Sequence, residues 1–179
     1  MLSYDFMDWE NILSGKSIEI FFRTLDDGDL SGFSDAVILW IKGMEFLVRV
    51  PNSSEAPPGD FHKTATAIFA QYGLPLYAEF DIYFYSTNKK AIIPEDAILH
   101  TLLVEPGSVR YATYALLLLK KIEKEIDKTH LLKEAVRFGV KNQVIGMLEF
   151  LETHKRPEGQ PLPSWNEFIL KVNCYAVIA

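Results

Sequence analysis

The sequence predicts an α+β fold, in which a small mixed β-sheet with a covering helix is followed by a helical C-terminal half. The first half alternates short apolar segments with turn-forming residues, which is typical of strands. From Pro94 onward the apolar residues recur at helical spacing. About 49% of the 179 residues are hydrophobic, enough for a packed core without a disulfide or a structural metal. We expect two portions, an α/β portion over residues 1–93 and a helical portion over residues 94–179.

Three strands are expected before residue 60. Ser17–Thr24 is rich in Ile and Phe and lies between turn signals, so it predicts a strand. Ala36–Val50 is too long for one strand and contains Gly43 near its centre, which favours two strands joined by a tight turn. The segment Pro51–Gly59 is rich in Pro and Ser and predicts a loop.

A helix and a strand are expected next. The apolar residues of Phe61–Tyr72 share one helical face, Asp60 is placed to cap the N-terminus, and Gly73 to end the helix. Ala78–Tyr85 alternates and predicts a half-buried strand. One face of this strand is apolar (Phe80, Ile82 and Phe84), and the other carries Glu79, Asp81, Tyr83 and Tyr85.

The second half is expected to consist of helices. Their limits are predicted as Pro94–Val104, Val109–Ile126, a helix capped by Asp127 or Thr129 that stops at Gly139, Lys141–Glu152, and a last helix that begins at Ser164. Ser164 and Glu167 have the spacing of a capping box. The helix Val109–Ile126 is apolar nearly all round at mid-length, so we expect it to be the most buried of these.

Charge and hydropathy restrict the partners. The net charge is −6, and residues 1–93 carry 7 basic against 13 acidic side chains. This balance argues against general nucleic-acid binding, which depends on cations that neutralise phosphates. The longest apolar runs fall far short of the ~20 residues that span a bilayer, so no membrane association is expected. Cys174 is the single cysteine, which favours a cytoplasmic location, and we expect its thiol to be buried.

The segment Ser34–Leu39, Ser-Asp-Ala-Val-Ile-Leu, resembles the Ser-Asp-x-Asp-apolar-apolar stretch of nucleotidyltransferases of the DNA polymerase β superfamily, including the abortive-infection toxin type. In that superfamily two carboxylates on one strand and a third on a neighbouring strand hold two Mg²⁺ ions, which clamp the triphosphate and activate the attacking hydroxyl. The segment Ile93–Leu99 is similar to the Pro-x-Glu-Asp segment that opens the helical part of such proteins. The resemblance implies that residues 1–93 form a nucleotidyltransferase-like portion.

The resemblance also implies a site. Asp35 and Asp81 would be the catalytic and metal-binding carboxylates, on neighbouring strands with their side chains on one face. Ser34 and Glu79 would be the cofactor-binding residues. Val37 stands where the superfamily has its second carboxylate, so the metal shell would be half formed. We therefore expect no tight metal site and no turnover, with no resident cofactor.

The favoured hypothesis is a catalytically degenerate binding or regulatory module whose ligand is a nucleotide, another protein or a second copy of the chain. One alternative is an active transferase that uses Mg²⁺, with the missing carboxylate supplied by Glu79 or by the turn Asp26–Asp29. The other alternative is a helical protein-interaction module. In that case Tyr83 and Tyr85, beside Glu79 and Asp81, would form an exposed binding face or the edge of a homodimer.

Overall fold

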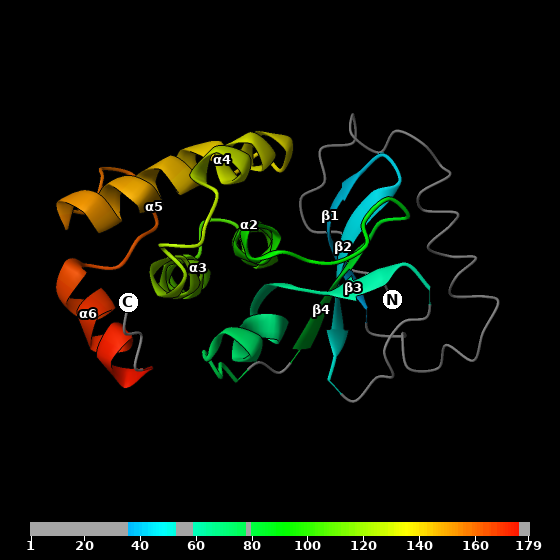
Figure 1. The fold of residues 1–179 in the computed structure, drawn as a ribbon, viewed down its shortest axis with the longest axis horizontal. Helices are drawn as coiled ribbons and strands as arrows, with labels where there is room; N and C mark the ends of the chain where they lie inside the picture. Colours follow the sequence, from blue (N-terminus) through cyan, green and yellow to red (C-terminus); the bar gives the residue numbers. More distant parts are fainter. Residues whose placement is uncertain (1–35, 53–58, 78–79, 176–179) are drawn as a thin grey trace. The chain divides into compact units, whose positions relative to one another are not determined.

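The computed structural model describes residues 36–52, 59–77 and 80–175, and it confirms the α+β fold (Figure 1). The chain divides into two compact units. The sheet unit comprises residues 1–64 and 78–91, and the helical unit comprises residues 65–77 and 92–179. The strand expected at Ser17–Thr24 lies outside the described residues.

The described residues of the sheet unit form a four-stranded sheet. Its strands are β1 (Val37–Lys42), β2 (Glu45–Pro51), β3 (Phe61–Lys63) and β4 (Phe80–Tyr85), in the order β1-β2-β4-β3. The sheet was expected to be mixed, but every pair of described strands is antiparallel. Antiparallel pairing follows from the short connection between β1 and β2, because a parallel pair needs a crossover of a dozen residues or more.

The β1–β2 hairpin confirms the tight turn expected in Ala36–Val50. Lys42 pairs with Glu45, and Gly43 has a φ of +62°, which a side chain would make unfavourable. The register shifts between Ile38 and Trp40, which marks a β-bulge in β1.

The prediction of a helix over Phe61–Tyr72 is wrong for its first turn. Residues Phe61–Lys63 form β3, and a 3-10 helix, η3, covers Ala65–Tyr72. Two features explain the difference. Phe61 packs edge-on against Phe46 of β2, with ring centroids 5.7 Å apart, which draws this segment into the sheet. Ala65 has a φ of +52°, a left-handed conformation that interrupts a right-handed helix.

One face of the sheet has a core of aromatic and β-branched side chains. Its buried residues are Ala36, Phe46, Val48, Val50 and Tyr83, and Ile38, Ile41, Phe61 and Tyr85 pack against them. Tyr85 stacks on Phe46 at a centroid distance of 4.8 Å. Ile82 and Phe84 are buried as well. The strand β4 therefore has buried side chains on both faces, whereas its alternating sequence predicted burial on one face.

In the helical unit, the described residues form η3 and five α-helices. They are α2 (Pro94–Val104), α3 (Val109–Lys121), α4 (Lys128–Arg137), α5 (Lys141–Thr153) and α6 (Trp165–Cys174). Three expected helix starts are confirmed: Pro94 occupies the first turn of α2, Asp127 caps α4, and Ser164 with Glu167 forms a capping box on α6. Among the described residues, no helix combines the length and apolar character needed to cross a bilayer.

Among the described helices α2 is the most buried, which corrects the expectation for the segment Val109–Ile126. Every residue from Glu95 to Val104 is buried, because α2 packs against η3, α3 and α4 within the helical unit. The helix α3 lies beside α2 (Figure 1) and ends at Lys121, one turn earlier than expected. Its residues Ala115–Leu119 are all buried, as their all-round apolar pattern predicted. Cys174, expected to be buried, is exposed at the end of α6.

Candidate functional site

The described part of the expected metal site is Asp81, near the start of β4. Its Oδ2 atom lies 2.8 Å from the Nζ atom of Lys63 in β3. The register explains this contact. Lys63 lies opposite Tyr83, and Tyr83 shares a strand face with Asp81 two residues earlier, so the ammonium reaches the carboxylate diagonally. The side chains are 44% exposed for Lys63 and 22% for Asp81.

Tyr83 is a second neighbour of Asp81. Its ring belongs to the core of the sheet unit, and the Asp81 carboxylate acts on its hydroxyl. The pKa of Tyr83 is raised, first because burial disfavours the charged phenolate, and then because of the charge and the hydrogen bond of Asp81. The cluster of Lys63, Asp81 and Tyr83 is therefore an ion pair beside a phenol that stays neutral.

The cluster is poorly suited to a divalent cation. A metal ion at Asp81 would lie close to the Lys63 ammonium, and unit charges 4 Å apart near a protein surface interact by about 4 kcal/mol, roughly twice that for a divalent ion. At the second ligand position, the side chain of Val37 has no oxygen that could bind a metal ion. Within the parts of the chain that the structure describes, no group of three His, Cys, Asp or Glu side chains could hold a metal ion.

The remaining expected site residues, Ser34, Asp35 and Glu79, lie outside the described residues. Their placement beside Asp81 therefore stays a prediction. Asp35 is followed by β1, and β2 lies between β1 and β4. Adjacent strands are about 4.8 Å apart, so β1 and β4 are separated by roughly 10 Å.

The two tyrosines expected on an exposed face are enclosed instead. Tyr83 is only 7% exposed, and Tyr85 is half-buried between Phe46 and Phe61. Burial raises the pKa of Tyr85, and the charge of Asp60 adds to the effect. The prediction of an exposed binding face built on these rings is therefore wrong.

The acidic pair in the segment Ile93–Leu99 has structural roles. Asp96 accepts a hydrogen bond from the backbone N–H of Ile93 at 3.0 Å, which stabilises the start of α2. Glu95, only 6% exposed, accepts one from the backbone N–H of Asp127 at 2.8 Å and so holds the start of α4 against α2. Both carboxylates act on Tyr72: its pKa is raised first by burial and then by their charges.

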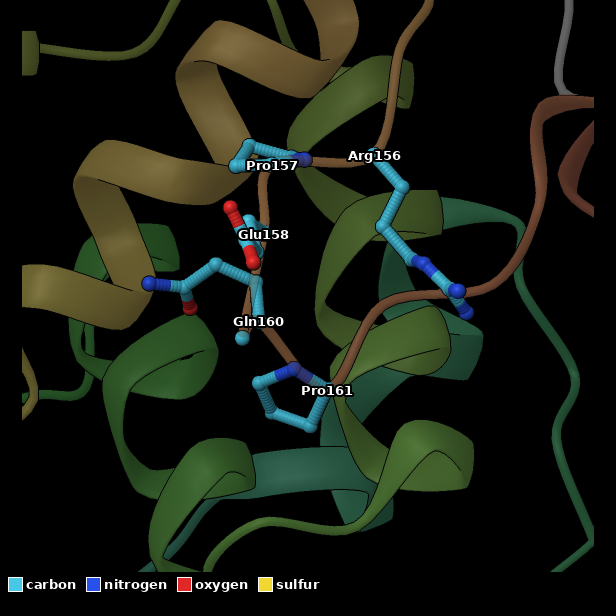
Figure 2. Close-up of a pocket in the computed structure, with 6 residues that line it drawn as sticks. Arg156, Pro157, Glu158, Gln160 and Pro161 are labelled. Atoms are coloured by element: carbon cyan, nitrogen blue, oxygen red, sulfur yellow. The ribbon is translucent and has the colours of Figure 1, made fainter.

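A cavity of about 590 Å³ lies beside the loop between α5 and α6. Figure 2 shows Gln160 reaching from this loop toward α5, while Arg156 points the other way. Gln160 Nε2 donates to the carbonyl of Asn142 at 3.3 Å, and a Cβ on Gly146 would lie 2.8 Å from the Gln160 side chain. The lining residues, Arg156–Pro161, include a single cation and a single anion, so the cavity offers no pair of carboxylates for metal or acid–base chemistry.

Sequence reasoning missed Lys63, because this residue was assigned to a helix. The alternation of Phe61, His62 and Lys63, directly after a loop, was the available signal for a short strand. It could not have identified Asp81 as the partner, because that requires the register between β3 and β4.

Comparisons with known proteins complete this description. A search of curated proteins finds no match, and a search of solved structures finds none. A family model described as HVO_2833_C, C-terminal, matches residues 58–177, more than half of the chain. The match includes β3 and β4 of the sheet unit and all the helices described above. The chain therefore belongs to the HVO_2833_C, C-terminal family.

Proposed function

We propose that this chain is a catalytically degenerate, nucleotidyltransferase-like module that binds or regulates a partner and transfers no nucleotide. The observation that carries the proposal is the ion pair between Lys63 and Asp81. An acid that serves two magnesium ions must leave its oxygens open to them, and Mg²⁺ gives up its waters reluctantly. The charge of Asp81 is instead balanced by Lys63, whose ammonium lies 2.8 Å from the carboxylate.

Two finer features belong to the proposal. A cytoplasmic location agrees with the single cysteine in 179 residues, because thiols stay reduced there. A homodimer is one form that the binding module could take, with a second copy as the partner. Light scattering of the purified chain tests this form, and a monomer over the working concentration range would contradict it.

The test of the main proposal is a nucleotide-transfer assay. The full chain is incubated with each of the four α-³²P-labelled ribonucleoside triphosphates, Mg²⁺ or Mn²⁺, and either total RNA or a protein extract as acceptor. We expect no transfer above that of Asp81→Asn, since the wild-type carboxylate is engaged by Lys63. Transfer that is present in the wild type and lost in Asp81→Asn would overturn the proposal and support the active-transferase alternative.

A further inference from the structure

The helix α6 buries little of its apolar surface. Among its ten residues, Phe168 is the one that is buried. The side chains of Trp165, Ile169 and Val172 are half-buried, and Leu170 is 64% exposed. A helix of this length is marginal in water by itself, because most of the stability of a helix in a protein comes from packing its apolar side chains. A partner that covers α6 would add packing that the described residues do not provide.

The outward face of α6 has an apolar centre between two polar flanks. Leu170 and Cys174 are four residues apart, so they lie one turn apart along the side of the helix that is turned away from the buried Phe168. Two asparagines follow one flank, and an acid and a base follow the other. The exposed residues of this face are Asn166, Glu167, Leu170, Lys171, Asn173 and Cys174.

The charged flank of this face complements itself. Glu167 lies near the start of α6 and Lys171 lies one turn later, so the face carries no net charge. When two such helices pack antiparallel, Glu167 of each copy approaches the turn of the other copy that contains Lys171. The bonds of Glu167 to Ser164 use Oε2, and a carboxylate has a second oxygen that accepts.

We propose that the outward face of α6 is the contact surface of a homodimer, in which α6 of a second copy packs antiparallel with Leu170 at the twofold axis. This inference rests on the proposed function, because it names a second copy as the partner of the binding module.

Symmetry and charge both favour a second copy as the occupant. A twofold contact brings the same patch of both copies together, so the residue at the axis meets itself. Leucine gains apolar contact there, whereas a charged residue would be repelled. The two flanking charges are opposite, so the face has no preference for a strongly acidic or strongly basic partner. An antiparallel copy pairs both charges at once.

The expected dimer is weak. A helix of ten residues is about 15 Å long. A single pair of such helices buries less than the ~1,200 Å² at which stable interfaces begin. We therefore expect a reversible equilibrium between monomer and dimer, with a dissociation constant in the micromolar range.

The test is sedimentation equilibrium of the full chain over a series of micromolar concentrations. Leu170→Glu places two like charges at the axis and should raise the dissociation constant about tenfold, equivalent to about 1.4 kcal/mol. Val136→Glu is the matched control, because Val136 of α4 is 59% exposed and receives the same charge. We expect it to change the dissociation constant less than twofold. Circular dichroism verifies that both variants are folded.

A cysteine cross-link tests the antiparallel geometry and remains decisive if Leu170→Glu does not fold. With Cys174→Ser as the background, Leu170→Cys places one thiol of each chain at the axis, and oxidation with diamide should join two chains. Val136→Cys in the same background should stay unlinked.

Three results would overturn the inference. They are a monomer at every concentration, equal effects of Leu170→Glu and Val136→Glu, and equal cross-linking of the two cysteine variants. None of these results bears on the nucleotide-transfer assay, so a wrong dimer surface leaves the non-catalytic function standing.

Discussion

The two units use buried or half-buried carboxylates in different ways. In the sheet unit, Asp81 is balanced by a neighbouring cation, Lys63, at a partly exposed position. In the helical unit, Glu95 is buried and accepts a backbone N–H from the start of another helix. The first arrangement depends on charge and solvent, and the second on a hydrogen bond shielded from water. In each case the carboxylate has a partner that lies on another element of the same unit.

The shielded interior of the helical unit should tolerate truncation of its buried side chains poorly. Leu117 is fully buried in α3, so Leu117→Ala should lower the free energy of unfolding by about 2–5 kcal/mol. Urea denaturation followed by circular dichroism measures the loss. Leu170→Ala is the control, because this residue of α6 is 64% exposed and should change stability by less than about 0.5 kcal/mol. A loss below ~1 kcal/mol at Leu117 would mean that α3 is not central.

The buried hydrogen bond of Glu95 should have the next largest effect. Glu95→Ala leaves the Asp127 N–H without its acceptor, which should cost about 1–3 kcal/mol. Glu95→Gln keeps a carbonyl acceptor and should cost less. The same urea titration applies, with Glu152→Ala, an exposed acid on α5, as the control. Equal stability of Glu95→Ala and Glu152→Ala would contradict the stabilising role assigned to the buried hydrogen bond of Glu95.

Tyr83→Phe tests the neutral donor of the sheet unit. At pH 7 the loss of the hydroxyl, on which Asp81 acts, should cost about 1 kcal/mol. The folded-state pKa of Tyr83 is raised above its ordinary value of 10.0, so the unfolded chain ionises first. Its contribution is fully present below pH 10 and falls as the pH rises through the folded-state pKa. Stability between pH 9 and 11 should therefore decline less in Tyr83→Phe than in the wild type, and an equal decline would contradict this assignment.

The smallest effect is expected for the ion pair. Lys63 is 44% exposed, so solvent screens its attraction to Asp81. A double-mutant cycle with Lys63→Met and Asp81→Asn should give a coupling below about 1 kcal/mol, which decreases further at 1 M salt. A larger coupling that is insensitive to salt would place the pair in a far less solvated environment than this structure describes.

The parts of the fold that sequence reasoning predicted are those specified locally. The turn at Gly43, the cap at Asp127 and the capping box at Ser164 each depend on a few consecutive residues. The strand β3 was missed because the spacing of Phe61, Ala65 and Ile68 also fits a helix. Its pairing is decided by aromatic neighbours that are distant in the sequence.

The candidate site shows the same limit. The sequence indicated that Asp81 lies on a strand, and the structure confirms that strand. Its partner Lys63 depends on the register between β3 and β4, and the position of β2 beside β4 depends on the order of the whole sheet. Neither follows from residue spacing within one segment.

The most direct test of the central claim is Mn²⁺ binding measured by electron paramagnetic resonance. If Asp81 is a structural partner of Lys63 and Tyr83, the wild-type chain should reduce the signal of free Mn²⁺ only slightly. Asp81→Asn should give the same small reduction. A strong loss of the free signal with the wild type, absent with Asp81→Asn, would identify Asp81 as a metal ligand and contradict the account.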